Sequence, residues 1–196
     1  MARNILFLFR LFVFLMCIFQ VFGHTSPDLP DGWFSAGDSP NDYLMGVDHT
    51  IFYGRAPGSS GFIKALPSAN DKGFGTMMQN FFPKKFIGKR VRLSCFVKHE
   101  NVLGWAGMWM RVDTIMENVL DNMFDRKITG TGDWVKFESV LDVPKDTINL
   151  AFGILLSGAG EAWLDNCKFE IVDSSVSTTA TTPKKLDHPI NLSFQS

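Results

Sequence analysis

The segment Gly104–Asp113 alternates with a period of two between small or apolar residues and a mixed set of aromatic and charged residues. Its even positions are Ala106, Met108, Met110 and Val112, and its odd positions are Trp105, Gly107, Trp109, Arg111 and Asp113. Because successive side chains of a β-strand point to opposite faces of the sheet, this pattern predicts a strand whose even positions lie in a core. The chain is therefore expected to contain a sheet that carries two tryptophans on its other face.

That second face has two interpretations. Indole rings beside a guanidinium and a carboxylate suit a surface that stacks on sugar rings and hydrogen-bonds to their hydroxyls, and exposed apolar patches of this kind mark binding sites. Alternatively, a loop or a second layer covers the face, because strands that are apolar on both sides are common in protein interiors. The sequence leaves both interpretations open.

The chain from about Asp31 to Asp173 has the features of an all-β domain. Apolar and aromatic runs are separated by turns rich in glycine, proline, asparagine and aspartate. The expected strands are Gly61–Leu66, Phe74–Phe82, Arg90–His99, Trp105–Asp113, Trp134–Val143, Ile148–Leu156 and Ala162–Val172. Ile115–Phe124 is expected to be a loop. This spacing of strands and turns predicts an antiparallel β-sandwich, of jelly-roll type.

The two ends of the chain differ from this body. Met1–Gly23 combines arginines with an apolar run that is shorter than the ~20 residues of a membrane span, so it is expected to be a secretory signal peptide. An uncleaved signal anchor is the alternative. Residues 24–30 then form a lead-in, 31–173 the β-sandwich, and 174–196 a Ser/Thr-rich linker and tail. The protein is expected to be extracellular, with no stable membrane span after cleavage.

The charge balance argues against one class of partner. After removal of residues 1–23, 17 lysines and arginines face 20 aspartates and glutamates, a net charge of −3. A basic patch of the kind that binds nucleic acid is therefore not expected. No cofactor is expected either, and the oligomeric state stays open.

Two cysteines, Cys95 and Cys167, lie outside the signal segment. Each has apolar neighbours two residues away, so both thiols are expected to point at the interior of the sandwich. An even number of cysteines in a secreted chain favours a disulfide, and two buried free thiols are the alternative. Asn191 begins the sequence Asn-Leu-Ser, the candidate for N-glycosylation.

Several motifs together resemble an uncharacterised bacterial domain family that is sometimes fused to helix-turn-helix regulators. They are GWFSAGDSPNDYLMGVD, GWAGMWMRVD, LDNMFDRKITGTGDW, VLDVP and INLAFGILLSGAGEAWLDN. This family implies no activity, and a chain with a signal peptide and no helix-turn-helix segment does not take over the regulator role. The late strand that ends in Trp-Leu-Asp-Asn is more distantly similar to carbohydrate-binding modules with the galactose-binding-like jelly-roll fold. That resemblance implies a fold, which alone does not supply a function.

Motifs for catalysis and metal binding are absent from the sequence, which has no HExxH, no pair of CxxC motifs and no GxSxG. Glu138 and Asp142 would lie about 13 Å apart along one strand, beyond the ~5–10 Å that a glycosidase needs. His49 beside Asp48 lacks an identifiable nucleophile. An enzyme is therefore not the expected function. A structural calcium ion held by Asp165 and backbone carbonyls stays open.

The region Leu120–Trp134 groups polar side chains after the tryptophan strand and could line a ligand groove. The expected ligand-binding residues are Trp105, Trp109, Arg111, Asp113, Asn122, Arg126 and Trp134. The competing interpretation is a self-contained loop in which Arg126 pairs with Asp121 or Asp125. The predicted function is a secreted, non-catalytic module that binds an extracellular ligand, in the first place a glycan. The alternatives are a glycan-active enzyme and a structural or adhesion protein whose aromatic face contacts other proteins.

Overall fold

The computed structural model describes residues 28–70, 72–180 and 192–193. Within these residues the chain forms nine β-strands, all paired antiparallel, and one short 3-10 turn, η1, at Pro40–Asp42. The strands are β1 Phe34–Gly37, β2 Tyr43–Asp48, β3 Ser60–Ala65, β4 Phe74–Phe81, β5 Lys89–Thr114, β6 Asn118–Asp121, β7 Ile128–Val143, β8 Thr147–Ser157 and β9 Glu161–Val172. The expected signal peptide and Asn191 lie outside the described residues.

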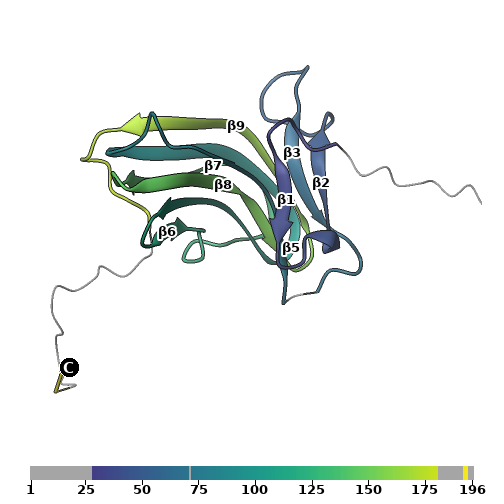
Figure 1. The fold of residues 1–196 in the computed structure, drawn as a ribbon. Coiled ribbons are helices and arrows are strands. Elements are labelled where there is room, and N and C mark those ends of the chain that lie inside the picture. The colour runs from purple at the N-terminus through teal and green to yellow at the C-terminus, as the bar shows by residue number, and fades with distance from the viewer. Residues whose placement is uncertain (1–27, 71, 181–191, 194–196) are drawn as a thin grey trace, which may run out of the picture.

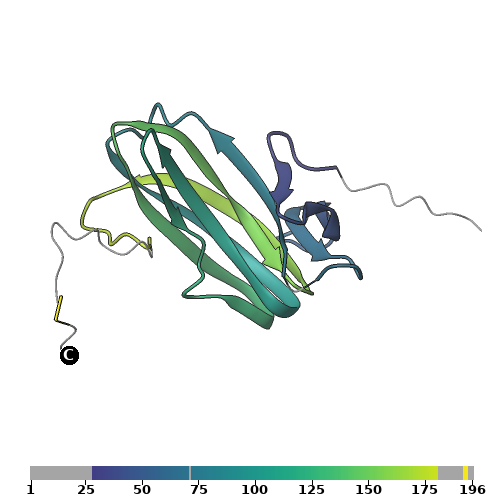
Figure 2. The same cartoon turned by 60° about the horizontal axis from the view of Figure 1, so that its bottom comes forward.

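Strand β5 is long enough to take part in two sheets. Its first half pairs with β7 and β9, and its second half pairs with β8 and β6. Its register against β7 shifts three times between Val97 and Ala106, and Asn101 has a positive φ of 52°. Such bulges bend a strand. The hydrogen-bonded path runs β1-β4-β8-β5-β9-β3-β2, with β6 and β7 also paired to β5, so all nine strands are connected through β5. The bend in β5 divides this path into a first sheet, β7-β5-β9-β3-β2, and a second sheet, β6-β5-β8-β4-β1. Figures 1 and 2 show the long curved strands, with β1, β2 and β3 gathered near one end.

The core lies between the two sheets. In the second half of β5 the even residues Ala106, Met108, Met110 and Val112 are fully buried, which confirms the predicted core face. In the first half of β5 it is the odd residues that are buried in the same core: Val91, Leu93, Cys95 and Val97. The bulges between the two halves change the parity, because an extra residue moves every later side chain to the other face. One strand thus supplies core residues to both layers.

The described strands differ from the predicted ones in four ways. The strands expected at Arg90–His99 and Trp105–Asp113 are one continuous strand, β5, because the bulged segment between them keeps its pairing with β7. The expected loop Ile115–Phe124 contains the edge strand β6. Strand β7 begins at Ile128 rather than at Trp134, and the short strands β1 and β2 were not predicted.

Cys95 and Cys167 form a disulfide, with their Cα atoms 4.1 Å apart. Cys95 is buried as expected, but Cys167 is exposed, so the prediction that both thiols point into the interior is wrong for Cys167. The cause is an irregularity in β9: Asn166 has a positive φ of 48°, and the register with β5 shifts between Ser94 and Phe96. Cys167 therefore lies at the interrupted part of the strand rather than within a regular inward-facing row.

The first residues of the Ser/Thr-rich tail pack against the sandwich. The backbone N–H of Thr179 donates to the carbonyl of Val140 on β7 at 2.9 Å, and the N–H of Val140 donates to the Thr179 hydroxyl at 2.7 Å. Ala180 contacts the core. The segment 174–180, expected as a linker, is thus attached to the folded domain. No helix in the described part of the chain has the length and apolar character that crossing a membrane requires.

Candidate functional site

A shallow cleft of about 250 Å³ lies on the outer face of the second sheet. Side chains from β1, β4, β8, β5 and the β6 region contribute to it, so the cleft spans the whole width of the sheet. Its lining residues are Ala36, Gly37, Phe74, Thr76, Met78, Trp109, Arg111, Leu120, Asn122 and Leu155. Most of these residues are apolar, and the polar ones are Thr76, Arg111 and Asn122.

Trp109 forms the floor of this cleft. It is only 6% exposed and packs with Met78, Ala151 and Leu155 in a small cluster on the outer side of the sheet. Its indole N–H donates to the Thr76 hydroxyl at 2.8 Å. Because β8 lies between β5 and β4, the indole must reach across β8 to make this bond. Of the two interpretations of this face, the covered one is therefore correct for Trp109, whose large ring is buried among neighbouring strands.

Trp105 lies beside this cluster and is half-buried. Its ring meets the ring of Phe124 edge to face, with centroids 5.6 Å apart. The Lys127 ammonium lies 3.8 Å from the Phe124 ring centroid and 5.7 Å from that of Trp105. Phe124 is 58% exposed. Aromatic pairs and cations over rings are favourable contacts, so these three side chains form an ordered aromatic edge that solvent can reach.

Arg111 and Asp113 form a two-pronged ion pair on the same face. The guanidinium Nε and Nη2 donate to the two carboxylate oxygens of Asp113 at 2.6 and 3.0 Å, and the Asn149 amide donates to Asp113 at 2.9 Å. Burial would raise the pKa of Asp113, but the hydrogen bonds from Arg111 and Asn149 lower it below its ordinary value. The pair places a fixed guanidinium at the border of the cleft.

The loop after β6 is held by its own ion pairs. Arg126 contacts Asp121 at 2.6 Å and Asp125 at 2.9 Å, and the side chain of Asp121 is fully buried. Thr179 from the tail also donates to Asp121. Burial alone would raise the pKa of Asp121, but the hydrogen bonds from Arg126 and Thr179 bring it below its ordinary value. The competing interpretation of a self-contained loop is confirmed for Arg126.

The structure thus divides the seven predicted ligand residues. Those that gather at or beside the cleft are Trp105, Trp109, Arg111, Asp113 and Asn122. Arg126 is engaged within the loop, and Trp134 lies on the outer face of the first sheet, where its ring is 6.1 Å from that of Tyr53. The sequence did not single out the cleft residues contributed by β1, β4 and β8. The alternation of Phe74, Thr76 and Met78 was the signal that could have found the β4 set.

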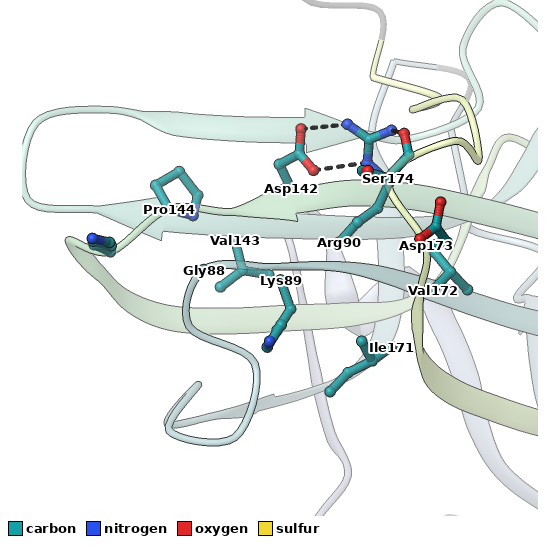
Figure 3. A pocket seen from close by; sticks show the side chains of 11 residues that line it. Gly88, Lys89, Arg90, Asp142, Val143, Pro144, Ile171, Val172, Asp173 and Ser174 are labelled. Carbon is teal, nitrogen blue, oxygen red and sulfur yellow. Dashed lines mark hydrogen bonds and ion pairs between the residues drawn. The ribbon is translucent and has the colours of Figure 1, made fainter.

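A larger hollow, of about 650 Å³, lies where β5 begins and β9 ends. Figure 3 shows Arg90 and Asp142 facing each other there, joined at 2.8 and 2.9 Å. The Nη1 of Arg90 also donates to the carbonyls of Ser174 and Val176 at 2.6 and 2.5 Å. No aromatic ring lines this hollow within the described residues. Its arginine is used to attach the start of the tail, which makes it a structural clamp.

Side-chain clusters that could hold a metal ion are absent from residues 28–70, 72–180 and 192–193: no three His, Cys, Asp or Glu side chains come together there. The carboxylate of Asp165, the residue considered for calcium, accepts hydrogen bonds from the backbone N–H of Tyr53 at 2.7 Å and of Asn166 at 2.5 Å. Asp165 therefore holds the loop that precedes β3 against β9.

No protein-family model matches the chain. A curated relative is the uncharacterized HTH-type transcriptional regulator YbfP of Bacillus subtilis strain 168, which is 43% identical over 169 residues. The match covers 84% of this chain and 56% of the relative, so the chain spans little more than half of that protein. The resemblance to a domain that occurs with helix-turn-helix regulators is confirmed.

Solved structures with a similar fold include carbohydrate-binding modules. The CBM22-1 xylan-binding domain of Paenibacillus barcinonensis Xyn10C has a TM-score of 0.51 at 14% identity, over 76% of this chain and 91% of the other. Another xylan-binding domain of family 22 gives 0.51 at 13% identity, over 72% and 88%. The enzymatically active domain of tailspike protein 4 of bacteriophage CBA120 gives 0.54 at 9%, over 72% and 20%. At these identities the likeness shows the fold alone, and it confirms the predicted jelly-roll sandwich.

Proposed function

We propose that the chain is a non-catalytic glycan-binding module whose site is the cleft on the outer face of the second sheet. The observation that carries this proposal is the cleft, with its apolar floor and fixed guanidinium, together with the solvent-exposed aromatic edge of Trp105 and Phe124 beside it. A sugar ring has an apolar face of C–H groups and a rim of hydroxyls. It would stack on the Trp105–Phe124 edge while Arg111 and Asn122 hydrogen-bond to its hydroxyls.

The shape of the cleft supports an extended ligand. Its volume of about 250 Å³ lies below the ~300–1,000 Å³ of pockets that enclose a small molecule, so the ligand would lie across the sheet rather than inside it. The xylan-binding domains with the same fold support a saccharide as the ligand class. The identity of the sugar is open in this proposal.

The residues of the cleft favour binding over hydrolysis. Acid–base cleavage of a glycosidic bond uses two carboxyl groups that flank the bond. The described lining of the cleft contains one arginine and no carboxylate. The nearby Asp113 is hydrogen-bonded to Arg111 and Asn149, and its lowered pKa keeps it ionised and unsuited to donate a proton.

A glycan array followed by calorimetry tests this function. Phe124→Ala should weaken binding of the selected glycan by ~1–3 kcal/mol, as expected for an aromatic anchor. The matched control is Phe82→Ala, which removes another phenylalanine that is 79% exposed but is neither in the cleft lining nor paired with the Trp105 ring. Equal affinity of the two variants, or an array on which no glycan binds, would contradict the proposal. Dimerisation that Phe124→Ala abolishes would favour the structural or adhesion alternative.

We also propose that the protein is exported. The signal-like sequence of residues 1–23 supports this, and so does the Cys95–Cys167 disulfide, because such bonds persist mainly in oxidising compartments. The name of the B. subtilis relative supports a different setting, in which the same cleft senses a ligand for a regulator. Mass spectrometry of fractionated cells separates the two. Export predicts an N-terminus within a few residues of His24 outside the cell, whereas an intact Met1 in the cytoplasmic fraction favours the regulator.

A further inference from the structure

The outer face of the first sheet carries a second aromatic cluster, formed by Tyr53, Phe96 and Trp134. The Tyr53 ring stacks on the Phe96 ring with centroids 3.7 Å apart and planes 14° from parallel, and the Trp134 ring stands at 70° to it, 6.1 Å away. Tyr53 is 39% exposed. Its backbone N–H is held by Asp165 on β9, so the loop that carries the ring is attached to the sheet. The cluster is therefore an ordered platform that solvent reaches.

A polar hollow of about 320 Å³ adjoins this platform. Phe96 belongs to both, because it lines the hollow and supports Tyr53. Lys136 on β7 lies directly opposite Phe96, and Lys168 on β9 lies directly opposite Ser94. The side chains that line the hollow come from three neighbouring strands and the bulge in β9: Arg92, Ser94, Phe96, Lys136, Asn166, Lys168 and Glu170.

The hollow has an excess of positive charge. Three cations and one carboxylate line it, and the adjacent Glu138 contacts two of these cations, Lys136 at 2.6 Å and Arg92 at 3.7 Å. Glu170 contacts Arg92 at 3.2 Å. Lys168 is exposed and has no ion-pair partner among the described residues. After these pairings one positive charge remains, at Lys168.

The platform also has free hydrogen-bonding groups. Within the described residues, neither the Tyr53 hydroxyl nor the Trp134 indole N–H has a hydrogen-bond partner. Aromatic side chains with an apolar ring and a polar end are suited to surfaces that are partly covered by a ligand. The face thus combines ring surface, two polar ends and one uncompensated ammonium.

We propose that this face is a second saccharide-binding site, specific for a sugar that carries an anionic group, either a carboxylate or a sulfate. The sugar ring stacks on Tyr53 and Trp134, and its anionic group meets Lys168 in the hollow. This site lies on the opposite side of the sandwich from the cleft. It shares no residue with the cleft, so a result that contradicts one site does not contradict the other.

Calorimetry on the full chain with three probes tests this site. The probes are an oligogalacturonate, its carboxyl-reduced neutral counterpart and a sulfated oligosaccharide of similar length. We expect at least one anionic probe to bind about tenfold more tightly than the neutral one, and that binding to weaken at high salt. Comparison of the carboxylated probe with the sulfated probe identifies which anionic group is recognised. Equal binding of neutral and anionic probes, or no binding of either anionic probe, would overturn the proposal.

Variants then locate the binding. Lys168→Gln and Trp134→Ala should each weaken binding of the anionic probe about tenfold. Phe124→Ala, beside the cleft on the other face, should leave that affinity unchanged. Thermal melts of the variants check that each is folded, and Lys168→Gln alters only an exposed side chain. If Phe124→Ala weakens binding of the anionic probe and Lys168→Gln does not, the probe occupies the cleft and the proposal of a second site is wrong.

Discussion

The outer face of the second sheet is apolar at its centre, whereas the outer face of the first sheet carries a row of ion pairs beside its aromatic platform. On the second sheet Trp109 is buried together with Met78, Ala151 and Leu155. On the first sheet the outward side chains of β5, β7 and β9 form ion pairs, four of them between neighbouring strands and one, Lys136–Glu138, within β7. These pairs are Arg90–Asp142, Arg92–Glu138, Arg92–Glu170, Lys98–Asp133 and Lys136–Glu138.

This difference separates two kinds of tryptophan. An aromatic ring packed among apolar neighbours contributes several kcal/mol to folding, whereas a partly exposed ion pair contributes about 0–1 kcal/mol. Replacement of Trp109 is therefore expected to lower mainly the stability of the fold. It should affect ligand binding only indirectly, through the floor of the cleft. Trp134, on the face held by weak pairs, is expected to act mainly on binding. A residue's type does not decide between these roles, but its neighbours do.

The largest expected effect is that of Trp109→Ala. Removal of a buried large aromatic ring leaves a cavity and deprives the Thr76 hydroxyl of its donor, so the free energy of unfolding should fall by ~3–5 kcal/mol. Trp134→Ala should cost less than about 1 kcal/mol, because surface substitutions rarely cost more. Urea denaturation of both variants measures the contrast. A loss of equal size in the two would mean that the faces do not differ as described.

The next largest effect is expected for Asp121→Asn, which should lower the free energy of unfolding by about 3 kcal/mol at neutral pH. The reason is that the substitution leaves the charge of Arg126 without its buried partner. The pKa of Asp121 is lowered in the folded state, so its stabilisation is present above the ordinary pKa of about 4 and is lost as the pH falls through the lowered value. The difference in free energy of unfolding between wild type and variant should therefore stay constant from pH 7 to about pH 4 and shrink as the pH falls further. A difference that does not shrink below pH 4 would contradict this role for Asp121.

Much of the sandwich was predictable from period-two alternation. The pattern of Gly104–Asp113 correctly places four residues in the core, because burial on one side of a strand imposes the alternation directly. What the alternation could not give is the parity change within β5, since a bulge depends on the pairing with β7 and leaves no fixed residue signature. The continuity of β5 was missed for that reason.

The site was predictable only in part. The sequence identified Trp105, Trp109 and Arg111 as one face, which the strand geometry guarantees. It also grouped Trp134 with them, because both stretches are aromatic and polar. Which sheet carries Trp134 is decided by the partners of β5, a long-range property that one sequence does not display. The contributions of β1, β4 and β8 to the cleft are likewise set by strand order.

A smaller effect is expected for the hydrogen bond beneath the cleft. Thr76→Val keeps the shape of the side chain but removes the acceptor for the buried indole N–H of Trp109, which should cost about 1–2 kcal/mol. Thr76→Ser keeps a hydroxyl at this position and serves as the control. Urea denaturation should place the serine variant closer to wild type than the valine variant. The reverse order would mean that the methyl group of Thr76, and not its hydroxyl, supports the floor.

The smallest effect should come from the ion pairs of the first sheet. Arg92 lies between Glu138 and Glu170, and all three side chains are at least a quarter exposed. Arg92→Gln should therefore cost no more than about 1 kcal/mol at low ionic strength. This cost should shrink in 1 M salt, because the screening length falls from about 10 Å at 0.1 M to about 3 Å.

The losses caused by Trp109→Ala and Thr76→Val should persist in high salt, since they arise from packing and from a buried hydrogen bond. Urea denaturation of the three variants at both salt concentrations measures this. A loss for Arg92→Gln that exceeds 2 kcal/mol and does not respond to salt would show that its aliphatic part packs as an apolar side chain does, and the contrast between the two faces would then be one of degree.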